Sequence, residues 1–327
     1  MSDMFYPWLQ AYRQNLSSCV KQQRIPQALL INGIAGLGKH ELAKQFAQYL
    51  ICLDKQETTY CGKCASCKLF SANTHPDFLL LQPEEPGKAI VVAAIRGLIS
   101  KLNLKPQYSG YRVVIIRPAD KMNINAANAF LKCLEEPPER TVFLLLSEQM
   151  QALPATIRSR CQKMLIKPPE INSAVHWLQD QGIDAEQTLL LHLAQGAPLR
   201  ALAYAQENVL AQRNSCFTEW QKVSQEKACP VQIAEKWQKI PDNQLVHWLL
   251  SWTEDLIKCY FQIDKSLLLN VDLEKHLRVL AMRLDLNRLF GFYDLLLKDT
   301  YRIKTQLNKQ LLFEEMLITW SQVTVNK

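Results

Sequence analysis

Short apolar runs without alternating polar positions recur through the first half of the chain. Besides a final short strand that is expected near 164–166, they lie at residues 27–32, 77–81, 111–116 and 141–147. Such a run is typical of a parallel strand that is buried on both faces of its sheet. Apolar residues at helical spacing occur before the first run, at 5–25, and between the later runs, at 42–50, 91–102 and 125–136. The alternation predicts an α/β domain built on a parallel sheet.

The second half of the chain shows only helical periodicity. Lys167-Pro168-Pro169 closes the α/β part, because consecutive prolines continue neither a strand nor a helix. Short helices are expected up to about residue 207, and further helices follow to the C-terminus. One carries an apolar stripe that is more typical of a helical core or a subunit interface than of a cofactor site: Leu245, Trp248, Leu249, Trp252 and Leu256. The pattern predicts domains at 1–167, 168–209 and 210–327.

Composition and charge describe an ordinary globular chain. Of its 327 residues 48% are hydrophobic and 21% charged, and the net charge is +7. A basic surplus of this size is compatible with a protein that works near nucleic acid, but it does not demonstrate one. No apolar run approaches the ~20 residues that span a bilayer, and the N-terminus lacks the basic and apolar regions of a secretory signal. We expect a cytoplasmic protein without a membrane segment.

A glycine-rich loop joins the first expected strand to the second expected helix. Gly33-Ile34-Ala35-Gly36-Leu37-Gly38-Lys39 follows the pattern of a phosphate-binding P-loop. In such a loop, backbone N–H groups and a helix N-terminus face an anion. The next position departs from the pattern, because His40 stands where a Ser or Thr hydroxyl would hold Mg²⁺.

The acidic pair of an active P-loop ATPase is also missing. It would follow the strand at 111–116, with one carboxylate holding Mg²⁺ and the other polarising the attacking water. Arg117-Pro118 stands there instead. Asp120 comes three residues late and is more typical of an N-cap or turn residue. Ser147 ends the strand at 141–147, where a polar side chain can face a nucleotide, although its own chemistry favours an ordinary residue at a strand end.

Four cysteines cluster shortly after the P-loop helix: Cys52, Cys61, Cys64 and Cys67. In a reducing compartment such spacing indicates a metal site more often than disulfides. Four thiolates suit tetrahedral zinc in a structural role, since no position is left open for catalysis. An iron–sulfur cluster is the weaker alternative, because the Cys-Pro of the ferredoxin-type run is absent. The third interpretation is that the four cysteines bind no metal.

Three further motifs complete the pattern. They are Asn125-Ala126-Ala127-Asn128-Ala129-Phe130-Leu131-Lys132-Cys133-Leu134-Glu135-Glu136-Pro137-Pro138, Ser159-Arg160-Cys161 and the segment at 308–315. Together with the P-loop and the cysteines, and in this order, they make the chain resemble the clamp-loader ATPases of the AAA+ class. The resemblance covers essentially the whole chain. It implies an AAA+ P-loop domain with a zinc module at 1–167, a helical lid at 168–209 and an all-α oligomerisation collar at 210–327.

The resemblance also implies roles for individual residues. Arg160 would be an arginine finger that reaches the γ-phosphate of ATP bound by a neighbouring subunit, although its own chemistry fits a surface ion pair equally well. Ser147 and Arg200 stand at the two sensor positions for a nucleotide bound by this chain. Gly33, Gly36, Gly38 and Lys39 would hold its phosphates. The departures at His40, Arg117 and Pro118 put that nucleotide in doubt, so ATP binding stays open and turnover is not expected.

The function implied is that of a non-hydrolysing stator in a bacterial clamp loader. Its partners would be ATPase motor subunits and a clamp-opening subunit in a hetero-pentamer that loads a sliding clamp on primed DNA. The assembly belongs to a replicative DNA polymerase holoenzyme, a nucleotidyltransferase. Two alternatives stay open. One is an active AAA+ motor subunit, and the other is a zinc-dependent DNA-binding protein, although no base-reading helix accompanies the cysteines.

Overall fold

The protein consists of two compact units. The computed structural model describes residues 6–85, 87–103, 105–108, 110–303 and 308–323. The described residues up to Trp177, together with Gln195–Arg200, form the first unit. Leu178–Ala194 and the described residues from Ala201 onward form the second. The three-domain division expected from the sequence stays a prediction.

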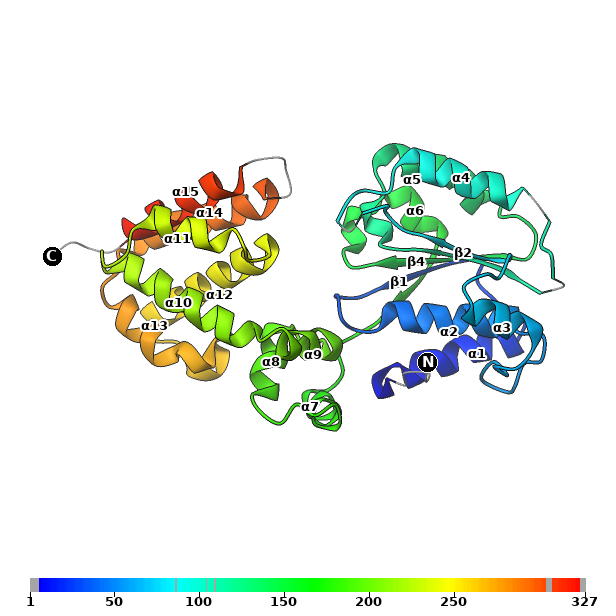
Figure 1. Cartoon of the computed structure of the whole chain (residues 1–327), viewed down its shortest axis with the longest axis horizontal. Coiled ribbons are helices and arrows are strands. Elements are labelled where there is room, and N and C mark those ends of the chain that lie inside the picture. The colour runs from blue at the N-terminus through cyan, green and yellow to red at the C-terminus, as the bar shows by residue number, and fades with distance from the viewer. Residues whose placement is uncertain (1–5, 86, 104, 109, 304–307, 324–327) are drawn as a thin grey trace. The chain divides into compact units, whose positions relative to one another are not determined.

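A five-stranded parallel sheet forms the centre of the first unit (Figure 1). Its strands are β1 (Ala28–Asn32), β2 (Phe78–Leu81), β3 (Arg112–Ile116), β4 (Thr141–Ser147) and β5 (Gln162–Leu165). Their order across the sheet is β2-β3-β4-β1-β5, and every pair is parallel. The predicted α/β fold class is confirmed.

Helices cover both faces of the sheet (Figure 1). One face carries α1 (Gln10–Lys21), α2 (Lys39–Ile51) and α3 (Ala65–Ser71), and the other carries α4 (Val92–Leu102), α5 (Ile124–Glu135) and α6 (Ala155–Arg160). Short 3₁₀ turns are η1 (Pro7–Leu9), η2 (Ala119–Lys121) and η3 (Met150–Ala152). The helix predicted at 5–25 is therefore shorter than expected, and its first residue, Phe5, lies outside the described residues.

The main apolar core lies between the sheet and the helices α4, α5 and α6. Its sheet side is formed by alternate residues of the central strands: Ala28, Leu30, Val114, Ile116, Phe143 and Leu145. The apolar residues between them are buried as well, which is why these strands read as continuous apolar runs. Phe130 of α5 packs edge-on against Phe143 with ring centroids 5.1 Å apart. Neither ring is exposed to solvent.

The prediction of a buried strand at 77–81 is wrong in one respect. β2 is parallel as expected, but among the described strands it lies at the edge of the sheet and pairs with β3 alone. Leu80 is 40% exposed, and the other three residues of β2 are half-buried. An apolar run alone does not show how many neighbours a strand will have, so the sequence could not reveal this edge.

The second unit is entirely helical in the part of it that the structure describes. Two helices contain residues of both units. They are α7 (Ile171–Asp180) and α9 (Pro198–Gln206). The other elements are α8 (Gln187–Leu193), α10 (Val209–Ser224), α11 (Pro230–Trp237), α12 (Asp242–Tyr260), η4 (Lys265–Leu267), η5 (Val271–Leu273), α13 (Glu274–Ala281), α14 (Leu286–Arg302) and α15 (Lys309–Ser321).

Tryptophans dominate the core of this helical unit. Trp220 of α10 stacks on Trp320 of α15 with ring centroids 3.9 Å apart, and the Trp320 Nε1–H donates to the Trp220 carbonyl at 2.9 Å. The predicted stripe on α12, from Leu245 to Leu256, is buried throughout. The interpretation of these aromatic residues as core is confirmed.

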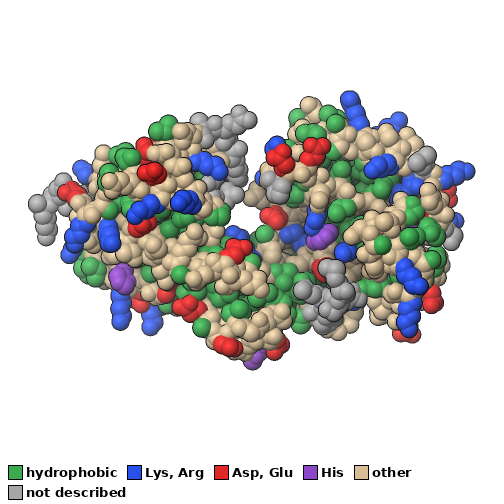
Figure 2. Space-filling model, in the orientation of Figure 1, with side chains coloured by type: hydrophobic (Ala, Val, Ile, Leu, Met, Phe, Trp, Pro, Cys, Tyr) green, Lys and Arg blue, Asp and Glu red, His purple; other side chains and the backbone are tan. Residues whose placement is uncertain are grey.

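The distribution of charged side chains and the character of the helices agree with the modest net charge and the lack of long apolar runs in the sequence. On the face shown in Figure 2, lysines and arginines are interspersed with acidic side chains over both units. Within the described ranges, none of the helices combines the length and the apolar character that a membrane crossing requires.

Removing the Phe130 ring should destabilise the first unit. Phe130→Ala deletes a fully buried aromatic side chain, and such changes cost about 3–5 kcal/mol. Ile124→Ala, on the same helix but 63% exposed, should change the free energy of unfolding by about 0.5 kcal/mol or less. Urea unfolding of the two variants measures the difference. Equal costs would contradict the packing described for α5.

Candidate functional site

The P-loop lies at the carboxyl edge of the sheet, between β1 and α2. Gly36 and Gly38 have φ angles of 84° and 82°, in the left-handed region where glycine is the least strained residue. A Cβ atom on Gly33 would lie 2.7 Å from the Ile166 carbonyl oxygen, so that position has no room for a side chain. The three glycines predicted from the sequence are thus required by the loop's own conformation and packing.

The outer side of this loop is covered by residues of the same unit. A Cβ on Gly38 would lie 2.8 Å from the Tyr6 ring, and one on Gly36 would lie 2.6 Å from the Cβ of Arg200. The indole N–H of Trp8 donates to the Leu37 carbonyl at 3.0 Å. The backbone and Cβ of Arg200 thus lie against the loop, while its role as a nucleotide sensor stays a prediction. The contacts of Tyr6 and Trp8 with the loop were not predicted, because the sequence pattern around these two aromatic residues does not indicate their partners.

The ammonium group of Lys39 is already bound by the loop itself. Its Nζ donates to the carbonyl oxygens of Gly33 at 2.6 Å and Ile34 at 2.8 Å. Burial lowers the pKa of Lys39, while Glu148 and Asp120 act in the opposite direction. In a working P-loop this ammonium contacts nucleotide phosphates, so a phosphate would have to compete with two carbonyl groups here.

His40 occupies the position of the metal-binding hydroxyl as a neutral imidazole. Burial and the positive charges of Arg117 and Lys44 lower its pKa to about 4. Its Nδ1 is buried and finds no hydrogen-bond partner among the described residues. Mg²⁺ prefers oxygen ligands, so this side chain does not replace the missing hydroxyl.

Arg117 stands where the first carboxylate of an active ATPase would be. Its guanidinium donates from Nε and Nη2 to Gln82 Oε1, at 3.2 and 3.0 Å, and burial lowers its pKa. Both residues directly follow parallel strands, β3 and β2, whose carboxyl ends meet at one edge. The sheet therefore presents a cation at the position where the metal-binding carboxylate is expected.

Asp120 has a structural role, as the sequence indicates, but not a local one. Its Oδ1 accepts a hydrogen bond from the Glu148 amide at 3.1 Å, which links η2 to the residue after β4. Ser147 lies opposite Asn32 in the sheet and is fully buried. The Ser147 Oγ has no hydrogen-bond partner among the described residues.

A cleft of about 650 Å³ opens beside the loop, a size within the range of ~300–1,000 Å³ that small-molecule sites occupy. Its walls combine the P-loop with the ends of β2, β3 and β4: Gly36, Gly38, Lys39, His40, Gln82, Pro83, Glu84, Gly87, Arg117, Pro118, Leu146, Ser147, Glu148 and Leu199. The cleft has the volume for a ligand. Its carboxylates, Glu84 and Glu148, follow β2 and β4 and not β3.

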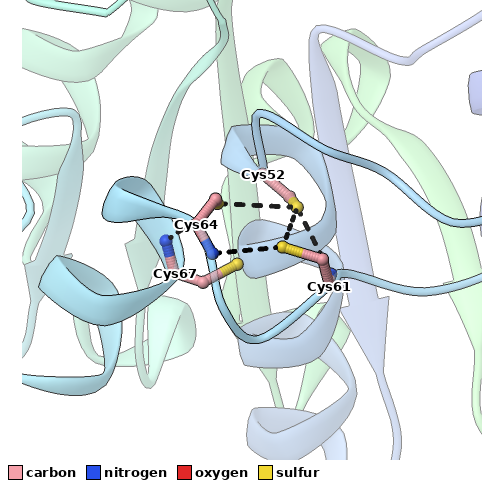
Figure 3. A group of neighbouring side chains, drawn as sticks. All are labelled: Cys52, Cys61, Cys64 and Cys67. Atoms are coloured by element: carbon pink, nitrogen blue, oxygen red, sulfur yellow. Dashed lines mark hydrogen bonds between the residues drawn. The ribbon is translucent and has the colours of Figure 1, made fainter.

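The four cysteines form a compact group of sulfur atoms (Figure 3). Cys52 directly follows α2, Cys61 and Cys64 lie in the loop before α3, and Cys67 lies on α3. All four Sγ atoms lie within 4.8 Å of one another, and Cys52 Sγ is 3.6 Å from that of Cys61 and 4.0 Å from that of Cys64. A tetrahedral site with Zn–S bonds of ~2.3 Å requires sulfur separations of about 3.8 Å. The geometry fits a zinc ion.

Backbone amides support these sulfurs. Cys61 N donates to the Cys52 sulfur at 3.4 Å, Cys64 N to that of Cys61 at 3.3 Å and Cys67 N to that of Cys64 at 3.4 Å. Hydrogen bonds of this kind favour the thiolate form, which is the form that binds metal.

Arg160 lies at the end of α6 and does not line the cleft. Its Nη2 contacts Glu135 Oε1 at 2.5 Å, and its Nη1 donates to the Thr156 carbonyl at 3.0 Å. The side chain is 36% exposed. Arg160 therefore forms the surface ion pair that its chemistry allows, and its role as an arginine finger stays a prediction.

The chain is similar to one protein family along nearly all of its length. A profile described as "DNA polymerase III, delta subunit" matches residues 9–170, and one described as "DNA polymerase III, delta subunit, C terminal" matches residues 207–322. The DNA polymerase III subunit delta' of Pseudomonas aeruginosa is 33% identical over 99% of each chain. That of Escherichia coli is 32% identical over 96% of this chain and 94% of its own. A solved DNA polymerase III gamma subunit-related protein from Thermotoga maritima aligns over 95% of this chain and 99% of its own, with 15% identity and a TM-score of 0.44.

The neutral His40 should make stability depend on pH. Its pKa of about 4 in the folded protein lies below the ordinary value of 6.5, so the unfolded chain binds more protons between these two values. Stability from this source is complete above about pH 6.5 and is lost as the pH falls toward 4, by at most about 3 kcal/mol. His40→Gln should lose less stability than the unmodified protein between about pH 7 and pH 4.5 in urea unfolding.

A matched control for this comparison is His192→Gln, because His192 is exposed. That variant should follow the unmodified protein at every pH. Parallel curves for His40→Gln and the unmodified protein would contradict the burial of a neutral imidazole.

Replacing one cysteine of the cluster should remove the metal. The unmodified protein should contain about one zinc ion per chain, the ratio set by one four-thiolate site. Cys64→Ser should lower this content and the unfolding temperature, whereas Cys229→Ser, at an exposed cysteine outside the cluster, should change neither. Elemental analysis and thermal unfolding measure the two effects. A folded protein that is pure and free of zinc would refute the metal site.

Proposed function

This chain belongs to the family of DNA polymerase III delta-prime subunits, and from that membership we propose that it acts as a non-hydrolysing subunit of a clamp loader. In this role it joins ATPase motor subunits and a clamp-opening subunit in a cytoplasmic hetero-pentamer. The assembly places a sliding clamp on primed DNA. The chain's contribution is Arg160, supplied across a subunit boundary to ATP that a neighbour holds.

The single observation that supports this proposal most strongly is the contrast between the chain's own site and Arg160. Arg117 pairs with Gln82 where a metal-binding carboxylate is needed, and Lys39 is bound by its own loop. A site with this arrangement has no group to hold Mg²⁺ at β3 and none to polarise a water molecule there. The cleft has the volume for a nucleotide, so binding without turnover is part of the proposal.

The role of Arg160 follows from the chemistry of phosphoryl transfer. Negative charge spreads over the transferred phosphoryl group in the transition state, and a guanidinium presents fixed donors to its oxygen atoms. Two of the five N–H groups of Arg160 are used within the chain, by Glu135 and Thr156. The remaining donors and the partial exposure suit contact with a phosphate that comes from outside the chain.

The zinc module has a structural part in this proposal. The cysteines join the end of α2, which starts at the P-loop, to α3. Zinc would hold this segment closed with thiolate ligands and supply no reactive position. A separate role in reading DNA finds less support, because the lysines and arginines visible in Figure 2 are interspersed with acidic groups.

The active-motor alternative makes the opposite prediction for the isolated chain. A motor subunit hydrolyses ATP at its own loop, and DNA and clamp stimulate it. The proposed stator hydrolyses ATP no faster than background under the same conditions.

Arg160→Ala in an assembly reconstituted with motor subunits tests the proposed function. Turnover at the one site that Arg160 completes should fall by about 10³-fold or more, the range measured for arginine fingers supplied in trans. In the total ATPase rate this appears as the loss of that site's share, with slower clamp loading and an assembly of normal size. Arg96→Ala, at an exposed arginine of α4, is the matched control and should leave both rates unchanged.

Two results would overturn the proposal. One is unchanged loading and ATPase rates for Arg160→Ala. The other is DNA-stimulated ATP turnover by the chain alone.

A further inference from the structure

The last residues of two neighbouring helices meet in an ion pair. Glu135 ends α5 and Arg160 ends α6. The contact of 2.5 Å between Glu135 Oε1 and Arg160 Nη2 is at the short end of charge-assisted hydrogen bonds. Nothing in the sequence spacing of 25 residues suggests this partner, which appears only once the helices pack together.

The position of Glu135 is unfavourable for its own helix. The C-terminal end of a helix carries partial negative charge, which disfavours a carboxylate there. Pro137 and Pro138 end α5 directly afterwards, so the side chain is fixed at this end. The ion pair with Arg160 offsets the unfavourable interaction between this carboxylate and the helix dipole. The effect of Glu135 on function is therefore expected at Arg160.

Glu135 and Thr156 together fix the plane of the guanidinium. The carboxylate accepts from Nη2 and the carbonyl accepts from Nη1, so both terminal nitrogens are anchored. Within the described part of the chain, the other three of the five N–H groups donate to no acceptor. An arginine held in this way reaches a phosphate without first losing the freedom of a long, mobile side chain.

We propose that Glu135 is a positioning residue for Arg160, holding the guanidinium ready for the phosphate of a neighbouring subunit's nucleotide. This inference rests on the proposed function, because it requires Arg160 to act in trans. It adds a residue that does not touch the nucleotide and that acts only through the arginine.

A blocking role for the same carboxylate makes a different prediction. If Glu135 held Arg160 away from the phosphate, removing the carboxylate would release the arginine and raise the ATPase rate. If Glu135 positions Arg160, removing it lowers the rate. Glu135→Gln separates charge from geometry, because the amide oxygen still accepts a hydrogen bond from Nη2 but carries no charge.

The experiment uses the full assembly with motor subunits, DNA and clamp, and compares kcat and KM for ATP. Glu135→Ala should lower turnover at the site completed by Arg160 by about three- to tenfold, the size of effect expected when a reacting group loses its orientation but stays present. The KM should not change, since the motor subunit's own residues bind the ATP. Glu135→Gln should restore most of the rate.

The matched control is Glu136→Ala. Glu136 is the next residue along the same helix end and is exposed. Its replacement should leave kcat, KM and the unfolding temperature unchanged. A loss equal to that of Glu135→Ala would show that any carboxylate at this end of α5 serves, and would overturn the specific pairing.

A double-mutant cycle shows whether Glu135 acts through Arg160. In the Arg160→Ala background, Glu135→Ala should cause no additional loss of turnover, because interacting residues are not additive. An additional loss of similar size, or a rate above that of the unmodified assembly, would overturn the inference. If Glu135→Ala fails to assemble, Glu135→Asp decides the question, because it keeps the charge but shortens the reach. Its turnover should fall, and a normal rate would overturn the inference.

The outcomes separate this inference from the function on which it rests. If Arg160→Ala has no effect, the proposed function fails and the inference fails with it. If Arg160→Ala lowers the rate while Glu135→Ala does not, the arginine acts in trans but Glu135 does not position it.

Discussion

Parallel pairing of the strands decides which side chains can meet at the P-loop. Because β1, β3 and β4 run in the same direction and lie side by side, their carboxyl ends form one edge. Asn32, Arg117 and Ser147 reach this edge wherever they stand in the sequence. A substitution at the end of one strand therefore acts directly on the chemistry of a loop that follows another strand. The effect of Arg117 on His40 is an example, since the guanidinium helps to keep the imidazole neutral.

The cations at this edge are hydrogen-bonded to neutral groups within the chain. Lys39 is bound by two carbonyls of its own loop, and Arg117 by Gln82. An active site of this kind leaves its cations free for the phosphates and its carboxylates free for the metal. Here the cations at the P-loop edge, Lys39 and Arg117, form hydrogen bonds within the chain that stabilise the fold. This explains how a chain can keep the glycines of a P-loop when the residues that use the loop have changed, since Gly33, Gly36 and Gly38 are required by packing and backbone conformation.

The sequence predicts those features that depend on a single segment. β4 has the bounds expected for it, Thr141–Ser147, because five consecutive apolar residues, 142–146, between a Pro-Pro pair and a polar segment favour a buried strand. The four cysteines converge as their spacing predicts. Features that depend on contacts between distant segments were missed. The exposure of Leu80 follows from the position of β2 at the sheet edge, and the cover of Gly38 by Tyr6 from the path of the N-terminal segment. No local pattern contains this information.

The pairing of Glu135 with Arg160 is also a contact between distant segments. It joins the motif that ends in Glu-Glu-Pro-Pro to the Ser-Arg-Cys motif through one ion pair. The segment that ends in Glu-Glu-Pro-Pro fixes the C-terminus of α5, and Ser-Arg-Cys lies at the C-terminus of α6. Cys161, directly after the arginine, is buried in the core shared by α5 and the sheet. The backbone at Arg160 is therefore held by the core, and the side chain by a carboxylate from the neighbouring helix. In the role proposed for Arg160 both restraints matter, because neither alone fixes the position of the guanidinium.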